Sequence, residues 1–104
     1  MSENIIKELT DEVRSFADAR DWHKFHTPKN LAMALAGEAG ELLAEFQWLT
    51  PEESSVSSLS AEQKKAIELE IADVQIYLLR LADVLDVDIA SVVREKLQIN
   101  ESRF

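Results

Sequence analysis

Apolar residues recur at helical spacing along most of the chain, and no segment shows the alternation expected of a β-strand. In the first segment one helical face is apolar, formed by Ile5, Ile6, Leu9, Val13, Phe16 and Ala17. This spacing predicts a first helix over residues 3–20. The chain has only two glycines and two prolines, so few turns interrupt its helices. The pattern therefore predicts an all-α fold.

Capping residues predict where the second helix begins. Thr27 is a good N-cap with Pro28 at the first helical position, so the second helix should run from Pro28 to about Trp48. The segment that follows, TPEESSVSSLS, is polar and serine-rich, as expected of a connection. Thr50 and Glu53 form the pattern of a capping box, which predicts one short turn within this connection.

The same signals predict two further helices. Ser60 and Gln63 repeat the capping-box pattern, so a third helix should begin at Ala61 and reach about Leu85. Asp88 is the expected N-cap of a fourth helix with the sequence IASVVREKLQINESR. We therefore expect a four-helix, bundle-like arrangement in a single domain that takes up all 104 residues, a length that suits one hydrophobic core.

The third predicted helix is apolar on nearly every side. Its apolar residues are Ile67, Leu69, Ile71, Val74, Ile76, Leu78, Leu79, Leu81 and Leu85. A surface helix needs only one apolar stripe, and four helices in one small bundle cannot cover the whole girth of this one. The pattern therefore predicts an oligomer in which this helix is shared with the subunit interface.

Composition limits the class of protein and its compartment. Apolar residues make up 46% of the chain and charged residues 30%, as in soluble globular proteins. There is no cysteine, which excludes disulfides and thiolate zinc sites. The N-terminal segment lacks a basic stretch followed by an apolar run, and no uncharged apolar segment is long enough to span a bilayer. We therefore expect a cytoplasmic protein that does not enter the membrane.

The formal net charge of −9 bears on the choice of partner. Proteins that bind nucleic acid polymers neutralise phosphates with Lys and Arg, so this strongly acidic chain is not expected among them. A small phosphorylated ligand is still compatible with the charge, because a bound divalent cation reverses the local field.

Two acidic pairs lie on predicted helices. Glu38 and Glu41 form an E-x-x-E pattern on the second helix, and Glu70 and Asp73 form an E-x-x-D pattern on the third. The two side chains of such a pair lie about 60° apart around the helix and roughly 4.5 Å apart along it, so both reach one cation. If the two helices pack antiparallel, as connected helices usually do, the acidic pairs can meet.

Two interpretations of these acids stay open from their spacing. Acids on a helix are often merely solvated; alternatively, four clustered carboxylates stay ionised only beside a cation, and oxygen ligands favour Mg²⁺ or Mn²⁺ over zinc. Gly37 and Gly40 favour the second interpretation, since a mid-helix glycine costs about 1 kcal/mol relative to alanine unless close helix packing or a ligand requires it. Glu45, one turn further on, has a position from which it could join the cluster, but it is expected at a solvent-exposed rim.

Other kinds of metal and phosphate site do not fit the sequence. A di-iron bundle needs Glu-x-x-His on two helices, whereas both histidines, His23 and His26, precede Pro28 in a connection. The chain contains neither an EF-hand loop nor the glycine-rich P-loop. Without a cysteine or a serine elbow, no covalent nucleophile is expected.

Aromatic residues gather in the connection DWHKFHTPKN, and another ends the predicted second helix. Trp22 and Trp48 are either hydrophobic plugs or the walls of a slot for a base, with His26 supplying a hydrogen-bonding edge. Lys96 and Asn100 share one face of the fourth helix, either as an exposed polar face or as a phosphate clamp.

Together these residues resemble the MazG-like superfamily of all-α nucleoside triphosphate pyrophosphohydrolases. The resemblance runs from RDWHKFHTPKNLAMALAGEAGELLAEFQWL through EIADVQIYLLRLADVLDVDI to KLQINESRF and covers most of the chain. The paired E-x-x-E and E-x-x-D pattern is the family signature, and the segment with DW, FH and NL is similar to the dCTP pyrophosphatase branch. The resemblance implies house-cleaning hydrolysis of the α–β phosphoanhydride of deoxynucleoside triphosphates, giving the monophosphate and pyrophosphate.

The resemblance also implies roles for individual residues. The ligands of Mg²⁺, with Mn²⁺ as an alternative ion, would be Glu38, Glu41, Glu70 and Asp73. Glu38 and Glu41 would be catalytic, with Glu38 as the candidate for orienting the attacking water. The contacts to the nucleoside triphosphate would come from Trp22, His26 and Trp48 at the base, and from Tyr77, Lys96 and Asn100 at the sugar or phosphates. The resemblance further implies a homo-oligomer, with a tetramer favoured over a dimer.

A function of another class is also open. The acidic faces would then form the docking surface of a non-catalytic helical module that binds a partner protein. In a third interpretation the chain senses nucleotides without hydrolysing them. The complete set of four acids argues against this third interpretation.

Overall fold

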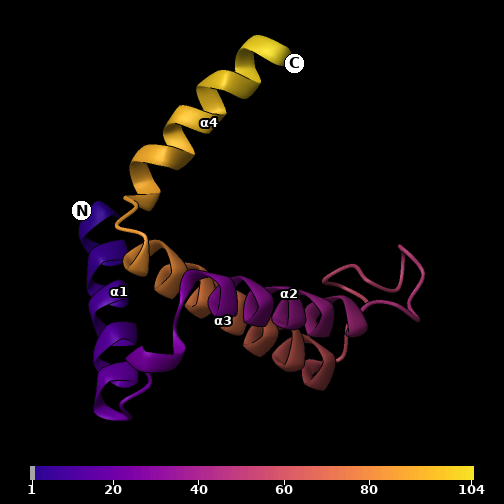
Figure 1. Cartoon of the computed structure of the whole chain (residues 1–104). Helices are drawn as coiled ribbons and strands as arrows, with labels where there is room; N and C mark the ends of the chain where they lie inside the picture. The colour runs from indigo at the N-terminus through magenta and orange to yellow at the C-terminus, as the bar shows by residue number, and fades with distance from the viewer. Residues whose placement is uncertain (1) are drawn as a thin grey trace.

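The computed structural model describes residues 2–104 and consists of helices, short turns and one longer connection (Figure 1). In chain order the elements are α1 (Ser2–Ala19), the 3-10 helix η1 (His23–Phe25), α2 (Pro28–Ala44), α3 (Ala61–Val84) and α4 (Ile89–Arg103). No strand occurs among these residues, so the prediction of an all-α fold is confirmed. No described helix is long and apolar enough to cross a membrane.

The predicted capping residues explain where α2 and α3 begin. Thr27 Oγ1 accepts a hydrogen bond of 3.2 Å from the backbone N–H of Asn30 in the first turn of α2. At the start of α3, Ser60 and Gln63 form the predicted reciprocal capping box, with distances of 2.8 Å and 3.0 Å. These bonds satisfy backbone N–H groups that have no partner inside the helix.

Side-chain hydrogen bonds also shape the two later connections. Thr50 and Glu53 form the predicted capping box, with distances of 2.8 Å and 3.1 Å. Asp88 is the N-cap residue of α4, but its carboxylate accepts a hydrogen bond from the Ser91 hydroxyl at 3.0 Å rather than from a backbone N–H. The predicted start of the fourth helix is therefore correct, although the side chain that should cap it binds elsewhere.

Helix α2 is shorter than its sequence pattern predicts. It ends at Ala44 rather than at Trp48. Beyond that point the N–H of Phe46 bonds to the carbonyl of Leu43 at 2.9 Å, so a tighter turn replaces the α-helical bond. Pro51 lies a few residues further on and disfavours helical backbone in the residue before it.

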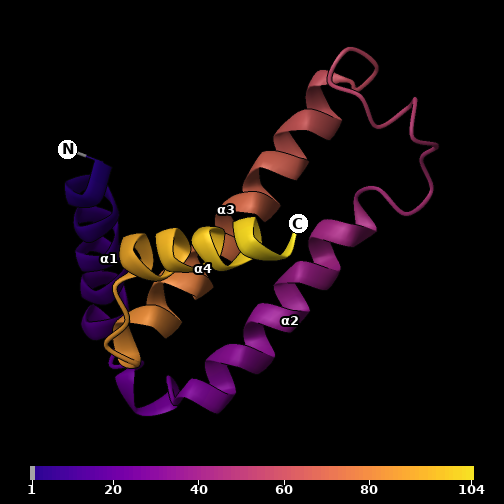
Figure 2. The same cartoon turned by 90° about the horizontal axis from the view of Figure 1, so that it is seen from above.

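Helices α2 and α3 lie side by side and run antiparallel, joined by the connection over residues 45–60 (Figure 1). Helix α1 crosses the other end of this pair and packs against α3, as the view from above also shows (Figure 2). Helix α4 leaves the end of α3 and extends away from the α2–α3 pair (Figure 1). The body of the chain is therefore formed by α1, α2 and α3.

The buried core of the described residues is small. Its apolar side chains are Ala17 of α1, Leu31 of α2, and Ile67 and Leu79 of α3. Many other large apolar residues are exposed, among them Leu69, Ile71, Ile76 and Leu78 on α3 and Val92, Val93, Leu97 and Ile99 on α4. Helix α3 is therefore apolar on sides that its own chain does not cover, as its sequence predicts.

Candidate active site

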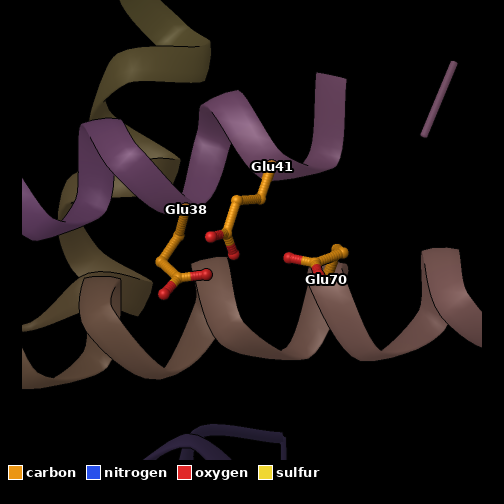
Figure 3. Close-up of side chains that lie close together, drawn as sticks. All are labelled: Glu38, Glu41 and Glu70. Carbon is orange, nitrogen blue, oxygen red and sulfur yellow. The ribbon is translucent and has the colours of Figure 1, made fainter. Parts of the chain in front are cut away.

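Three glutamates from two helices meet between α2 and α3. Figure 3 shows Glu38 and Glu41 of α2 and Glu70 of α3 pointing toward one another. One oxygen from each carboxylate lies within 4.8 Å of those of the other two. The three-residue spacing puts the first two on one face of α2, and the packing of α3 brings the third opposite them. The structure thus gathers three of the four predicted metal ligands.

Burial and mutual repulsion raise the pKa of two of these carboxyl groups. The pKa of Glu38 lies above the usual glutamate value, first because burial disfavours the charged form and then because of the charge on Glu41. Burial is also the largest cause of the raised pKa of Glu70, followed by the charges on Glu41 and Asp73. The cluster therefore resists its own ionisation unless positive charge lies beside it.

Two oxygens of the cluster fit a bound cation. Oε2 of Glu38 and Oε2 of Glu70 are buried, and neither has a hydrogen-bond partner in the described part of the chain. Buried carboxylate oxygens without donors are costly unless they are protonated or coordinate a metal. A donor set made only of carboxylate oxygens suits a hard cation such as Mg²⁺ or Mn²⁺. The residues present therefore fit a divalent cation.

Asp73 and Tyr77 follow Glu70 on α3, and both are half-buried. The carboxylate of Asp73 does not belong to the three-oxygen group, but its charge helps to raise the pKa of Glu38 and of Glu70. Glu45, expected at an exposed rim, is half-buried instead, and its charge also raises the pKa of Glu70. The acidic surroundings of the cluster therefore extend beyond the three glutamates.

Gly37 and Gly40 flank the site without serving close packing inside the chain. A Cβ atom built at either position would meet no other part of the described chain within 4 Å. Of the two explanations for these glycines, close helix packing does not apply within one chain, and room for a ligand stays a prediction. They leave open space on the face of α2 beside Glu38 and Glu41.

The aromatic residues of the predicted base slot divide into two places. The rings of Trp22 and His26 have centroids 6.2 Å apart, and Phe16 packs edge-on against Trp22 with centroids 5.7 Å apart. Trp48 is 86% exposed and follows the other end of α2. Because the 17 residues of α2 extend over roughly 25 Å, Trp22 and Trp48 do not form one slot within a single chain.

Lys96 and Asn100 lie one turn apart on α4, with Lys96 exposed and Asn100 half-buried. Helix α4 extends away from the α2–α3 pair, so the structure does not bring these residues to the glutamate cluster (Figure 1). The two predicted phosphate contacts therefore do not complete the site of their own chain.

A polar network near the end of α3 is absent from the sequence-based prediction. Arg80 is only 7% exposed, and its Nε donates to His26 Nδ1 at 3.0 Å while its Nη1 donates to Asp83 Oδ2 at 3.0 Å. Arg14 of α1 donates two bonds to the Asp83 carboxylate, of 2.8 Å and 2.7 Å, and its hydrogen bond is the main cause of the lowered pKa of Asp83. The one signal in the sequence was the spacing of Arg80 and Asp83, one helical turn apart.

The family model described as MazG-like matches residues 34–104, which include all four predicted metal ligands. The chain belongs to the MazG-like family. The matched residues take in α3, α4 and most of α2, but neither α1 nor the aromatic connection. The resemblance based on the two acidic pairs is thereby confirmed.

Relatives of this MazG-like chain extend the similarity toward its N-terminus. Human dCTP pyrophosphatase 1 is 44% identical over 89 residues, which cover 86% of this chain and 52% of the human protein. Bovine dCTP pyrophosphatase 1 is 38% identical over 103 residues, which cover 99% of this chain and 61% of the bovine protein. The chain thus spans little more than half the length of these curated relatives.

A solved structure gives the same result for the fold. A pyrophosphatase from Archaeoglobus fulgidus matches this structure with a TM-score of 0.85 and 43% sequence identity. The match covers 94% of this chain and 90% of the archaeal one. The helical arrangement of this MazG-like chain is therefore that of a pyrophosphatase of similar length.

Proposed function

We propose that the chain is a Mg²⁺-dependent nucleoside triphosphate pyrophosphohydrolase. It hydrolyses the α–β phosphoanhydride of (deoxy)nucleoside triphosphates, preferably dCTP-like ones, to the monophosphate and pyrophosphate, as house-cleaning of the cytoplasmic nucleotide pool. The cluster of Glu38, Glu41 and Glu70 carries this proposal, because two of its buried oxygens lack a partner in the described chain. Support for the reaction class comes from the names of its relatives, dCTP pyrophosphatase 1 and a pyrophosphatase.

In this proposal the acids hold the cation and position water. Glu38, Glu41 and Glu70 are the ligands, together with Asp73. When bound, Mg²⁺ or Mn²⁺ supplies the positive charge that neutralises the triphosphate and makes the α-phosphorus more electrophilic. Glu38 and Glu41 are the catalytic candidates: the raised pKa of Glu38 suits an oxygen that accepts a proton from water and orients it for in-line attack. Tyr77, on the same helix as Asp73, contacts the sugar or a phosphate.

The proposed enzyme is a homo-oligomer, with a tetramer favoured over a dimer. The exposed apolar faces of α3 and α4 support this, because large uncovered apolar surfaces usually mark contacts with other proteins. A second copy would also supply the base-contacting and phosphate-contacting residues that one chain does not bring to its own site. Trp48 of one chain would face Trp22 and His26 of another across the base, and Lys96 and Asn100 would reach the phosphates of a neighbouring site.

Product analysis tests the reaction. The protein is incubated with a panel of common and modified nucleoside triphosphates, with and without Mg²⁺, and the products are separated and quantified. We expect equal amounts of monophosphate and pyrophosphate, formed only with the cation and fastest from dCTP-like substrates. Diphosphate and inorganic phosphate would show cleavage of the other anhydride and overturn the proposal. Nucleotide binding without any product would identify a sensor instead.

A further inference from the structure

Arg80 has the most unusual surroundings of the residues that the proposed reaction does not use. Burying a guanidinium is strongly unfavourable unless its charge and its donors are satisfied. Here one carboxylate, that of Asp83, is shared between Arg80 at 3.0 Å and Arg14 at 2.7 Å. The remaining contact of Arg80 is the hydrogen bond from its Nε to His26 Nδ1 at 3.0 Å. A buried arginine that donates to a histidine constrains the chemistry of that histidine.

The constraint concerns the position of the ring proton. An arginine Nε always carries a hydrogen and never accepts, so the Nδ1 atom that faces it must be without a hydrogen. A neutral imidazole has one N–H, which then lies on Nε2. Protonation would place a second N–H against the arginine donor, and burial together with the charge of Arg80 lowers the pKa of His26. The hydrogen bond from Arg80 therefore favours the neutral form of His26 with its proton on Nε2.

The Nε2 edge of the His26 ring is not bonded to Arg80, and the ring lies beside that of Trp22. His26 is half-buried, and its Nε2 has no hydrogen bond to any residue that the structure describes. The Trp22 ring lies beside it at a centroid distance of 6.2 Å and is itself held edge-on by Phe16. Trp22 is 41% exposed, so a flat heterocycle stacked on the open part of its ring would have the ring of His26 as a neighbour. A pyrimidine ring with a carbonyl oxygen or an unprotonated ring nitrogen has the complementary acceptor.

We propose that Arg80 is a positioning residue that holds His26 as its neutral Nε2–H tautomer, so that this N–H donates to an acceptor on the base of the bound nucleotide. This inference rests on the proposed function, in which Trp22 and His26 face the base. Arg80 does not touch the nucleotide; it acts through His26. Arg14 shares Asp83 with Arg80 but does not bond to His26, so it supplies a matched control within the same network.

Nuclear magnetic resonance tests the tautomer without any turnover. Long-range proton–nitrogen correlation spectra of the ¹⁵N-labelled protein distinguish a protonated from an unprotonated ring nitrogen. The chain has two histidines, and a His23→Asn variant assigns the signals of His26. We expect Nδ1 unprotonated and Nε2 protonated at neutral pH. An N–H on Nδ1, or an even mixture of tautomers, would overturn the proposal even if the reaction is confirmed, and this spectrum decides even if variants of Arg80 fail to fold.

Two variants then connect the tautomer with the nucleotide. Arg80→Met should give a mixture of His26 tautomers and raise KM for the preferred triphosphate roughly three- to tenfold, the effect of about one hydrogen bond, with little change in kcat. Arg14→Met should keep the Nε2–H tautomer and the wild-type KM. An unchanged KM in Arg80→Met, or equal effects of both variants, would show that the network is only structural. A wild-type protein without turnover would overturn the proposed function but not the tautomer.

Discussion

Glu70 shows at the scale of one residue how metal dependence can arise from packing. Its pKa is raised by burial and by the charges on Glu41 and Asp73, and its Oε2 has no partner within the described residues. An amide of the same shape would remove the repulsion but would supply no charge for a cation. The metal-free protein and the proposed metal-bound protein therefore place opposite demands on this position.

The first prediction concerns the variant Glu70→Gln. We expect it to melt at a higher temperature than the wild type in the presence of a chelator, and to lose the stabilisation that Mg²⁺ gives the wild type. Thermal unfolding with and without Mg²⁺ measures both effects. Glu68→Gln is the matched control, because Glu68 lies on the same helix but is exposed and paired with Lys64 at 3.2 Å. A lower melting temperature in chelator combined with a normal response to Mg²⁺ would exclude a role of Glu70 in the site.

The second prediction concerns pH. The pKa values of Glu38 and Glu70 are raised above the ordinary value of 4.5, so above this pH the folded state binds more protons than the unfolded state. Their contribution to stability is complete below about pH 4.5 and is lost as the pH rises through the folded-state pKa values. Asp83 acts in the opposite direction, because its lowered pKa contributes stability that is present above the ordinary value of 3.8 and lost as the pH falls.

Comparison with Glu70→Gln isolates the contribution of Glu70 from that of Asp83, which is the same in both proteins. In chelator, the free energy of unfolding of the wild type should fall relative to that of the variant as the pH rises above about 4.5. Urea unfolding at a series of pH values measures this difference. Saturating Mg²⁺ should remove the trend, whereas a difference that is constant with pH would contradict the assigned pKa shifts.

At the scale of the element, α3 has some features that depend on residues close in sequence and others that depend on residues far away in the chain. Its start could be predicted from Ser60 and Gln63, because a capping box is formed by residues three apart. That the acids of α2 face those of α3 was also predictable. The helical repeat places the acids of each pair on one side of their helix, and two connected helices usually pack antiparallel. The network of Arg80 was not, because its partner His26 lies 54 residues away, and Arg14 meets Asp83 across 69 residues.

The ends and directions of the helices were the weakest part of the sequence-based prediction, because they also depend on contacts between residues far apart in the sequence. The apolar pattern of α2 continues to Trp48, but the helix yields to tighter turns after Ala44. The direction of α4 depends on how residues 85–88 turn and on contacts with α1, and no local pattern encodes these contacts. The separation of Trp22 from Trp48 by the length of α2 followed only from the structure.

The third prediction tests the start of α3. Ser60→Ala should lower the free energy of unfolding by about 1 kcal/mol, the usual cost of losing an N-cap serine. Mg²⁺ affinity should not change, since Glu70 lies several turns inside the helix. Urea unfolding and calorimetry measure the two quantities. Ser57→Ala in the exposed connection is the control and should leave stability near that of the wild type. Equal stabilities of the two variants would mean that the capping box does not stabilise α3.

At the scale of the whole molecule, the described chain has few buried apolar side chains, and all four of its α-helices carry exposed ones. A monomer with this surface would be prone to association. Helix α4 extends away from the body, and its Leu97 is 60% exposed. A neighbouring copy would cover these faces and bring Lys96 and Asn100 to a site that their own chain does not reach.

The fourth prediction is that Leu97→Glu dissociates the proposed oligomer into smaller species. In a monomer a substitution at this exposed position would change stability by no more than about 0.5 kcal/mol. In the proposed oligomer it places a charge in an apolar interface, so sedimentation should show smaller species and activity should fall. Val56→Glu is the control, because Val56 is 73% exposed in the connection before α3 and should tolerate the charge. A wild type that sediments as a monomer would contradict the proposed assembly.

Calorimetric titration of the metal-free protein with Mg²⁺, in the presence of a non-hydrolysable triphosphate analogue, tests the role of the glutamate cluster most directly. The wild type should bind Mg²⁺, and it should bind the analogue only when the cation is present. Glu41→Gln should lose Mg²⁺ affinity by about a hundredfold or more, since even changes beside metal ligands cost tenfold to a hundredfold, while Glu68→Gln should bind as the wild type does. Equal Mg²⁺ binding by Glu41→Gln and the wild type, or no Mg²⁺-dependent heat in the wild type beyond that of the analogue alone, would contradict a divalent-cation site at these glutamates.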